Sequence, residues 1–311
     1  MNGLPSATRP RALAPGTRVA LVAPAGPIDP ERIAASETRC RALGLEPVVF
    51  PSAGARDRYL AGTDDERLTD LQAAFDDPDI GAVWALRGGY GTLRILERLS
   101  LERQRVDPIP FIGFSDNTSL HVRHAELGVI SFHGPHPQAE PAGEAEAWFR
   151  RVLFQAEPAG ALPLPDGDPQ PQSLVPGVAE GRLVGGNLAI LAALCGTRHA
   201  LDAEGNIVFL EDVGEPAYRI DRMLLQLERS GALAGAVGLA FGRFTDDRED
   251  TEDRTSGVGD VLREVAEGLG IPGVLDLPFG HVESNFVLPV GVRARLDANT
   301  AALTLLEPAV A

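Results

Sequence analysis

Lysine is missing from this chain of 311 residues, so all 28 of its basic side chains are arginines. A Schiff-base lysine, a pyridoxal-phosphate lysine, a Walker A lysine and a Ser–Lys dyad are therefore excluded. We attribute this preference, in a chain rich in Ala, Gly and Pro, to a compositional bias of the source genome. A Ser–His–acid arrangement is the nucleophilic route that the remaining residues can assemble.

Positive charge is also scarce, because 44 acidic side chains outnumber the basic ones and give a formal net charge of −16. A chain this acidic repels a phosphate backbone, and no run of arginines supplies a local basic patch. We therefore expect no nucleic-acid partner. The acidic run Asp246–Asp253 lacks the glycine and the ligand spacing of a calcium loop, which favours a solvated loop.

Cysteines and long apolar runs are few. Cys40 and Cys195 are too far apart and too few for a disulfide framework or a metal cluster, which fits a reducing compartment. The first apolar run, Val19–Ala23, is too short for a signal peptide and is broken by Pro24. No apolar stretch approaches the roughly 20 residues of a membrane span. These absences predict a soluble, cytoplasmic protein with no membrane partner.

The chain does contain enough apolar residues, 44%, for a substantial core, and its length predicts two domains. In the first half, short apolar runs alternate with segments of helical spacing, which predicts an α/β fold with a Rossmann-like parallel sheet. The expected strands are Arg18–Ala23, Glu46–Phe50, Gly81–Leu86 and Ile109–Phe114.

The expected domain division follows the prolines. Residues 14–154 form the N-terminal α/β domain, and the aperiodic, proline-rich segment 155–177 is interpreted as a linker. Residues 178–311 form a smaller C-terminal α/β domain rich in β structure. Its helices are expected at Leu188–Leu194 and Ala217–Arg229, and alternating residues predict β structure over Val287–Leu306.

A serine lies where a strand is expected to end. Ser115 in the segment Gly113–Asn117 comes close to the G-x-S-x-G nucleophile elbow, with Asn117 in place of the final glycine. Such a turn exposes the hydroxyl and directs the backbone N–H of Asp116 into the same space. Taken alone, a serine at this place is more typical of a helix cap.

An acid and a histidine follow two later apolar runs. Glu211 comes directly after Ile207–Leu210, where Asp212 or Glu215 would serve as well, and His281 follows Phe279 and Gly280. Each alone has an ordinary structural interpretation. Together with Ser115 they give the nucleophile, base and orienting acid that a catalytic triad needs.

The glycine-rich turn at residues 87–91 has two interpretations. It lacks the G-x-G-x-x-G spacing of a dinucleotide site, so nucleotide binding is poorly supported. Glycine also lets a backbone N–H approach a substrate carbonyl, as an oxyanion hole requires, and Arg87 beside it can hold a carboxylate through two hydrogen bonds. The histidine pairs His121/His124 and His133/His136 occur without an H-E-x-x-H motif, so no metal is predicted.

Five motifs, in order along most of the chain, resemble the LD-carboxypeptidase family of serine peptidases. They are RGGYG at 87–91, GFSDNT at 113–118, GGNL at 185–188, LEDVGE at 210–215 and FGH at 279–281. The resemblance implies a two-domain enzyme without cofactor or metal. It also implies Ser115 as nucleophile, His281 as general base, Glu211 as orienting carboxylate and an oxyanion hole from the backbone N–H groups of Gly89 and Asp116.

The family resemblance also implies a reaction. Its members release terminal D-alanine from cell-wall (murein) tetrapeptides during peptidoglycan recycling in the cytoplasm, and relatives are commonly homodimers. Some relatives instead cleave microcin-type peptide–nucleotide conjugates, although segment 155–177 has no aromatic residue to stack on a base. A non-catalytic ligand-binding α/β protein is the second alternative. Arg87 is the first candidate for binding the substrate carboxylate, followed by Arg222, and Asn187 is a further candidate for substrate binding.

Overall fold

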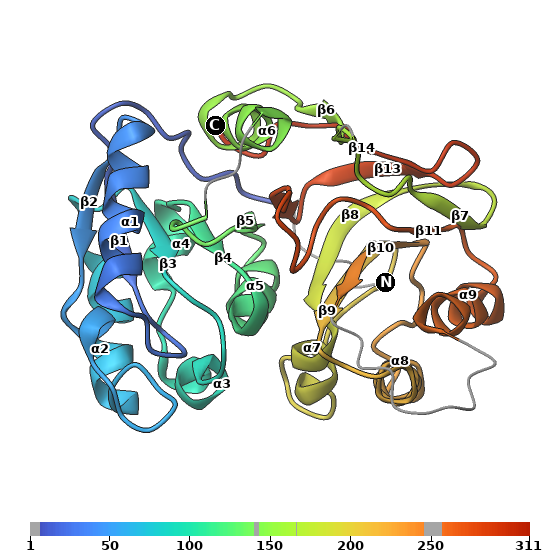
Figure 1. The fold of residues 1–311 in the computed structure, drawn as a ribbon, viewed down its shortest axis with the longest axis horizontal. Helices are drawn as coiled ribbons and strands as arrows, with labels where there is room; N and C mark the ends of the chain where they lie inside the picture. The colour runs from blue at the N-terminus through green and yellow to red at the C-terminus, as the bar shows by residue number, and fades with distance from the viewer. Residues whose placement is uncertain (1–6, 140–142, 166, 246–256) are drawn as a thin grey trace.

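The computed structural model describes residues 7–139, 143–165, 167–245 and 257–311. Two sheets with helices packed on them form two halves that lie side by side (Figure 1). The acidic run Asp246–Asp253 lies outside the described residues. Within the described ranges, no helix has both the length and the apolar character needed to cross a membrane.

The first sheet contains six strands in the order β12-β5-β4-β3-β1-β2. The strands β1 to β5 are parallel, as predicted, and β12 is antiparallel to β5. Their bounds are β1 (Arg18–Val22), β2 (Glu46–Val49), β3 (Ala82–Ala85), β4 (Phe111–Gly113), β5 (Ser131–His133) and β12 (Leu288–Val290). The buried residues of β1 and β3 on both faces explain why their sequences are continuous apolar runs.

Helices and short 3-10 turns connect these strands. They are α1 (Pro30–Ala42), η1 (Pro51–Gly54), α2 (Asp64–Asp76), α3 (Thr92–Ile95), η2 (Leu96–Arg98), α4 (Glu102–Val106), η3 (Ser115–Asn117), α5 (Thr118–Glu126) and α6 (Gly143–Phe154). The start of α2 is fixed by a capping box, in which Thr63 accepts from the Glu66 amide and Glu66 accepts from the Thr63 amide.

The second sheet contains eight strands in the order β6-β14-β13-β8-β9-β10-β11-β7. The four neighbours β8 to β11 are parallel, and the outer strands pair antiparallel. The bounds are β6 (Gly160–Ala161), β7 (Gln172–Val175), β8 (Val178–Asn187), β9 (Ile207–Val213), β10 (Gly238–Thr245), β11 (Gly273–Leu275), β13 (Arg293–Asp297) and β14 (Ala302–Leu305). Its helices are α7 (Leu188–Leu194), α8 (Ala217–Arg229) and α9 (Val258–Leu269). The predicted α/β fold class is confirmed, with a β-rich second half.

The structure differs from the expected domain division in two places. The segment 155–177 contributes β6 and β7, which pair with β14 and β11 as the two edges of the second sheet. Short edge strands tolerate the prolines that made this segment look like a linker. Strand β12, from the C-terminal part of the chain, joins the first sheet beside β5. The C-terminal part of the chain therefore completes the sheet of the first half.

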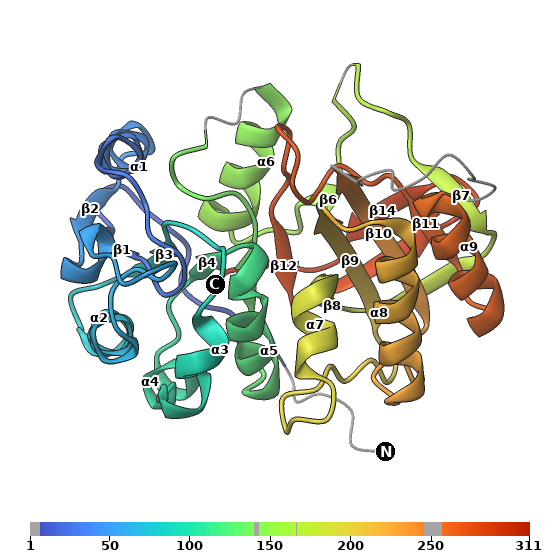
Figure 2. The ribbon, with the colours of Figure 1, turned by 60° about the horizontal axis from the view of Figure 1, so that its bottom comes forward.

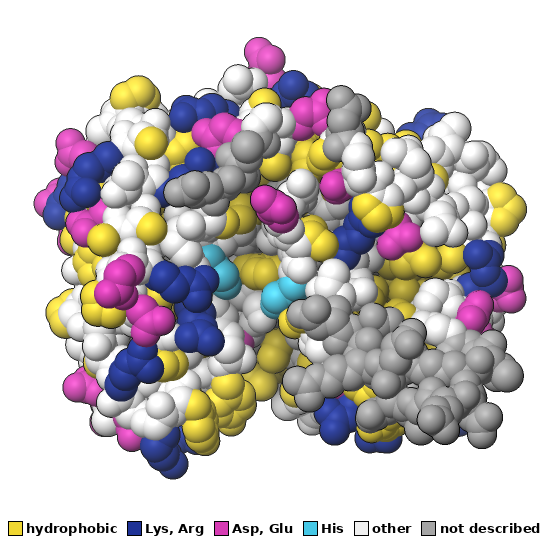
Figure 3. Space-filling view, viewed as in Figure 1, with side chains coloured by type: hydrophobic (Ala, Val, Ile, Leu, Met, Phe, Trp, Pro, Cys, Tyr) yellow, Lys and Arg dark blue, Asp and Glu magenta, His cyan; other side chains and the backbone are white. Residues whose placement is uncertain are grey.

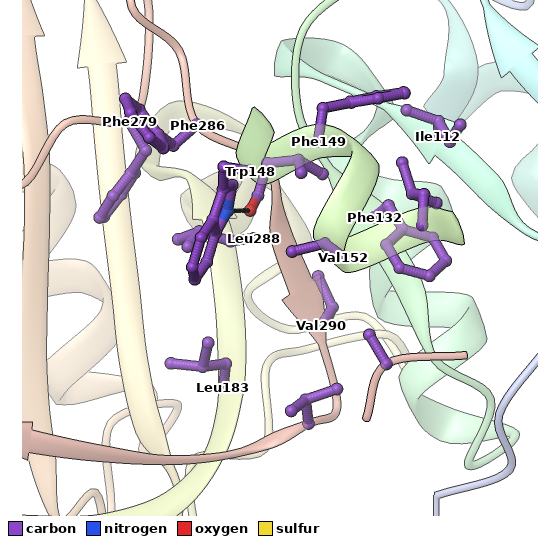
Figure 4. Close-up of a cluster of buried hydrophobic side chains, with 14 of the residues drawn as sticks. Ile112, Phe132, Trp148, Phe149, Val152, Leu183, Phe279, Phe286, Leu288 and Val290 are labelled. Carbon is purple, nitrogen blue, oxygen red and sulfur yellow. Dashed lines mark hydrogen bonds between the residues drawn. The ribbon is translucent and has the colours of Figure 1, made fainter. Parts of the chain in front are cut away.

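Helix α6 covers the seam between the halves, where a buried cluster contains residues of both (Figure 4). The indole N–H of Trp148 donates to the carbonyl of Val287 at 2.8 Å, and Phe149 stacks on Trp84 with ring centroids 5.2 Å apart. Below this cluster, α5 and α7 lie against each other (Figure 2). Because the cluster buries side chains from both sheets, it holds the two halves in a fixed relation.

Candidate active site

Ser115 lies at a strained turn where β4 ends. Its φ angle is +60°, in the left-handed region that residues with a Cβ rarely adopt. The side-chain amide of Asn117 fixes this turn by donating to the carbonyls of Phe114 at 2.9 Å and Arg87 at 3.2 Å. Gly88 packs so closely that a Cβ there would stand 2.8 Å from the Cβ of Ser115. Local strain of this kind is typical of active sites.

Glu211 and His281 form a hydrogen-bonded pair in the second half. Glu211 lies in β9 and is fully buried, and its Oε2 accepts a hydrogen bond from His281 Nδ1 at 2.7 Å. The His281 side chain retains 22% exposure. With Nδ1 donating to the carboxylate, the neutral ring carries its basic lone pair on Nε2. The pair thus has the base–acid arrangement of a triad.

Across the seam, His281 packs against Phe114, the residue that precedes Ser115. The rings of Phe114 and His281 have centroids 4.4 Å apart, which brings the base against the residue that precedes the serine. Between the described side chains of Ser115 and His281 there is no direct hydrogen bond. Such contacts are often long in the absence of substrate and shorten when it binds.

The backbone N–H groups of Gly89 and Asp116 have no acceptor among the described residues. Gly89 has a φ angle of +101°, which favours glycine at this place. The neighbouring Gly88 is fixed at both ends, since its N–H donates to His136 Nε2 at 3.1 Å and its carbonyl accepts from the Gly26 N–H at 3.0 Å. The two N–H groups, one on the glycine-rich turn and one directly after Ser115, suit an oxyanion hole.

Two buried side chains support the glycine-rich turn in roles that the motifs did not indicate. Arg67 is buried and donates to the carbonyls of Gly91, at 2.9 Å, and Pro24, while it pairs with Asp64. The side chain of Asp116 accepts hydrogen bonds from the N–H and hydroxyl of Thr92, and burial raises the pKa of this carboxyl. No local pattern in the sequence signals either role, because both depend on burial.

A cavity of about 570 Å³ opens beside His281 and is lined by residues of both halves. Its lining includes Phe114 and His136 from the first half and His281 and Glu283 from the second. Arg32, in the first turn of α1, also lines it. The space-filling view shows the hollow between the halves, with histidine side chains facing it and basic side chains nearby (Figure 3).

The three candidate substrate-binding residues have different surroundings in the structure. The Arg87 guanidinium donates to the carbonyl of Pro27 at 2.6 Å. Arg87 is not itself among the lining residues, but it directly precedes Gly88, whose N–H is bonded to His136 of the cavity lining. The Arg222 guanidinium lies over the Tyr218 ring on α8 and does not line the cavity. Asn187 is buried, caps α7 by accepting from the Ile190 amide, and donates to Asp212 at 3.0 Å. Through these contacts Asn187 stabilises the start of α7 and its connection to β9.

Of the four histidines considered for metal binding, His121, His124 and His136 are hydrogen-bonded to protein groups. His121 and His124 are buried in α5, where each is hydrogen-bonded to a backbone carbonyl. His136 supports Gly88 and donates from Nδ1 to the Ala85 carbonyl at 3.2 Å, and burial lowers its pKa to about 4. His133 lies beside Glu211. Their sequence spacing suggested these residues only as metal ligands, and it gave no sign that His136 contacts Gly88 or that His133 lies beside Glu211.

Comparison with known families and structures identifies the family of this chain. Residues 19–134 match the LD-carboxypeptidase N-terminal domain, and residues 180–296 match the LD-carboxypeptidase C-terminal domain. The chain belongs to the LD-carboxypeptidase family. The family resemblance inferred from the five motifs is confirmed, and the protein is a carboxypeptidase of this family.

Relatives span nearly the whole chain. One from Streptomyces coelicolor is 44% identical over 97% of both chains, and the murein tetrapeptide carboxypeptidase of Pseudomonas aeruginosa is 36% identical over 91% of this chain and 94% of its own. The crystal structure of muramoyltetrapeptide carboxypeptidase from Oxalobacter formigenes, at 30% identity, covers 94% of this chain and 100% of its own with a TM-score of 0.81. The microcin C7 self-immunity protein MccF, at 22% identity, covers 98% of this chain and 100% of its own with a TM-score of 0.87, which shows a shared fold.

Proposed function

We propose that this protein is a serine LD-carboxypeptidase that releases terminal D-alanine from murein tetrapeptides, with Ser115, His281 and Glu211 as its triad. The observation that carries the proposal is the 2.7 Å hydrogen bond from His281 to the buried Glu211, formed beside the strained turn of Ser115. The names of the Pseudomonas and Oxalobacter relatives support the substrate class. Peptides from cell-wall recycling in the cytoplasm are the proposed source, and a homodimer is the proposed assembly.

The reaction proceeds through an acyl-enzyme. Ser115 transfers its proton to His281 Nε2 as its Oγ attacks the carbonyl of the L-centre residue, while Glu211 stabilises the imidazolium. The backbone N–H groups of Gly89 and Asp116 donate to the oxyanion. His281 then protonates the departing amine of D-alanine. His281 then takes a proton from a water molecule, which attacks the ester carbonyl, and gives that proton to Ser115 Oγ as the acyl–oxygen bond breaks.

The terminal carboxylate of the substrate needs a cation in a protein of net charge −16. Arg87 is the proposed partner, because it directly precedes Gly88, which is bonded to His136 of the cavity lining, and its guanidinium retains donors beyond its bond to Pro27. Arg32 lines the same cavity and is placed to meet a second anionic group of the peptide. Arginine binds carboxylates through two parallel hydrogen bonds, which also orients them.

Mass spectrometry of peptide products tests this function. The purified protein is incubated with a murein tetrapeptide ending in D-alanine, with the all-L isomer and with a peptide–nucleotide conjugate. We expect loss of one alanine from the first substrate only, and no product with Ser115→Ala under the same conditions.

Other outcomes separate the alternatives. Cleavage of the conjugate, with the tetrapeptide intact, would replace the proposed substrate by that of a microcin-immunity peptidase. Binding of the tetrapeptide without turnover, equal in the wild type and Ser115→Ala, would favour a non-catalytic ligand-binding protein.

A further inference from the structure

A second histidine lies against the carboxylate of Glu211. His133 is the last residue of β5, and its Nε2 lies 3.7 Å from Glu211 Oε1, the oxygen that His281 does not use. Both side chains are fully buried. Both ring nitrogens of His133 and Oε1 of Glu211 lack a hydrogen-bond partner among the described residues.

The surroundings of His133 offer it few other polar contacts. The rings of Phe114, Phe209 and His121 pack around it, with centroids 5.0, 5.4 and 5.6 Å away. The titratable groups that face it are Glu211 and the three histidines His121, His136 and His281. Burial lowers the pKa of His133 well below its ordinary value, so the ring is neutral and carries one N–H.

We propose that His133 is a positioning residue that donates its Nε2–H to Glu211 Oε1, while His281 donates to Oε2. This inference rests on the proposed triad of Ser115, His281 and Glu211. His133 belongs to the first sheet and Glu211 to the second. The contact is therefore the means by which the half that carries the nucleophile orients the acid of the other half.

The chemistry of the two groups favours this assignment. A buried carboxylate oxygen without a donor is unfavourable, and so is a buried imidazole N–H without an acceptor. A movement of roughly 0.5 Å brings Nε2 and Oε1 to a normal hydrogen-bond distance and satisfies both. With one histidine on each oxygen, the carboxylate cannot rotate away from His281.

Steady-state kinetics of His133 variants test the proposal. His133→Phe keeps the ring packing and removes the donor, whereas His133→Gln keeps an N–H donor. We expect kcat of His133→Phe to fall about 10- to 100-fold with little change in KM, by analogy with other supporting hydrogen bonds. The Gln variant should recover a large part of this loss. His124→Phe, which removes another buried histidine without contact to Glu211, should retain wild-type kcat.

The pH profile separates positioning from packing. Without the donor to Glu211, the Glu211–His281 pair binds its proton more tightly, so the acid limb of kcat/KM should move to higher pH in His133→Phe. It should stay at the wild-type position in His133→Gln and His124→Phe. A variant that only loosens the core would lose thermal stability without moving this limb.

The wild-type protein gives an independent test if His133→Phe does not fold. Nitrogen-15 NMR of the histidine rings should show His133 neutral, with the proton on Nε2. The Nδ1–H tautomer, or a wild-type kcat and pH profile in His133→Phe, would overturn the inference. Ser115→Ala is measured in parallel: if it stays active, the proposed triad itself has failed, whereas an inactive Ser115→Ala beside an unaffected His133→Phe rejects only the role of His133.

Discussion

The two halves build their shares of the site by different physical means. In the first half, backbone conformation defines the site: Ser115 has a φ angle of +60°, and Gly88 and Gly89 allow the glycine-rich turn to pack against it. In the second half, a side-chain pair defines the site, because the buried Glu211 is hydrogen-bonded to His281. A strained turn is fixed locally, whereas an oriented acid depends on what buries it.

This difference explains why the seam between the halves matters for activity. In the proposed triad, Ser115 follows β4 of the first sheet, whereas Glu211 lies in β9 of the second sheet and is hydrogen-bonded to His281. Phe114, His133 and the shared cluster around Trp148 bring the two shares together. The site is thus a property of the assembled chain, and changes in either half should break it in distinguishable ways.

Removing one catalytic group from each half should give the largest effects. We expect Ser115→Ala to lower kcat by a factor of the order of 10⁶, and Glu211→Gln by about 10⁴, because the base then loses its orienting charge. The double variant should be no slower than Ser115→Ala, since the groups act as a unit. Rates of D-alanine release measure all three. Losses that multiply in the double variant would contradict a shared mechanism.

Crowding the backbone of the first half should come next. In Gly88→Ala the new methyl group would lie 2.8 Å from the Cβ of Ser115 and 3.1 Å from the Phe114 carbonyl, which displaces the turn. We expect kcat to fall about 10²- to 10³-fold, as for the loss of an oxyanion donor. Gly54→Ala, where no atom lies within 4 Å of the new Cβ, is the matched control. A folded Gly88→Ala protein with the kcat of the control would be incompatible with this geometry.

Changing the proposed substrate contact should affect binding more than turnover. For Arg87→Ala we expect KM for the tetrapeptide to rise about 10- to 100-fold, the value of a charged hydrogen bond, with kcat nearly unchanged. Arg222→Ala should leave both constants alone, because its guanidinium lies over Tyr218 on α8. An unchanged KM in Arg87→Ala would transfer the role to another cation, with Arg32 the next to test.

The smallest expected effects concern stability against pH, and they have opposite signs in the two halves. Burial lowers the pKa of His124 to about 4. Its contribution to the free energy of unfolding is therefore present above pH 6.5 and is lost as the pH falls toward 4. Burial raises the pKa of Asp212 to about 6, so stability from this group increases as the pH falls from 6 toward 4. Each contribution is at most about 3 kcal/mol.

Urea unfolding between pH 4 and pH 7 measures these contributions. In His124→Phe the loss of stability toward pH 4 should be shallower than in the wild type. In Asp212→Asn it should be steeper, because the opposing gain is gone, and the variant should be less stable at pH 7, where the carboxylate accepts three hydrogen bonds. Parallel curves for all three proteins would reject both assignments.

Much of the fold could be predicted from local patterns. The bounds of α7 and α8 are those expected, since each is a single helical run ended by turn residues. Strands β6 and β7 were missed because they are short edge strands among prolines. The pairing of β12 with β5 joins residues far apart in sequence, and no local pattern carries that information.

The candidate site, too, could be predicted from the sequence only in part. Ser115, Glu211 and His281 could be proposed because each follows an apolar run in the sequence, where a strand end and hence a ligand site are expected in α/β folds. In the structure only Ser115 lies at a strand end, since Glu211 is inside β9 and His281 is outside the strands. Arg67 and His133 could not, since their roles come from burial against groups that the sequence does not bring near them. Arg222 was proposed from its place on a helix of the second half, but the orientation of that helix keeps it out of the cavity.

The central claim is that the pair Glu211–His281 of one half activates Ser115 of the other. Labelling with a fluorophosphonate, followed by peptide mapping, tests it without reference to the natural substrate. The account predicts modification of Ser115 in the wild type, at a rate reduced about 10³-fold or more in Glu211→Gln and in His281→Ala. Modification at another residue, or an unchanged rate in both variants, would contradict it.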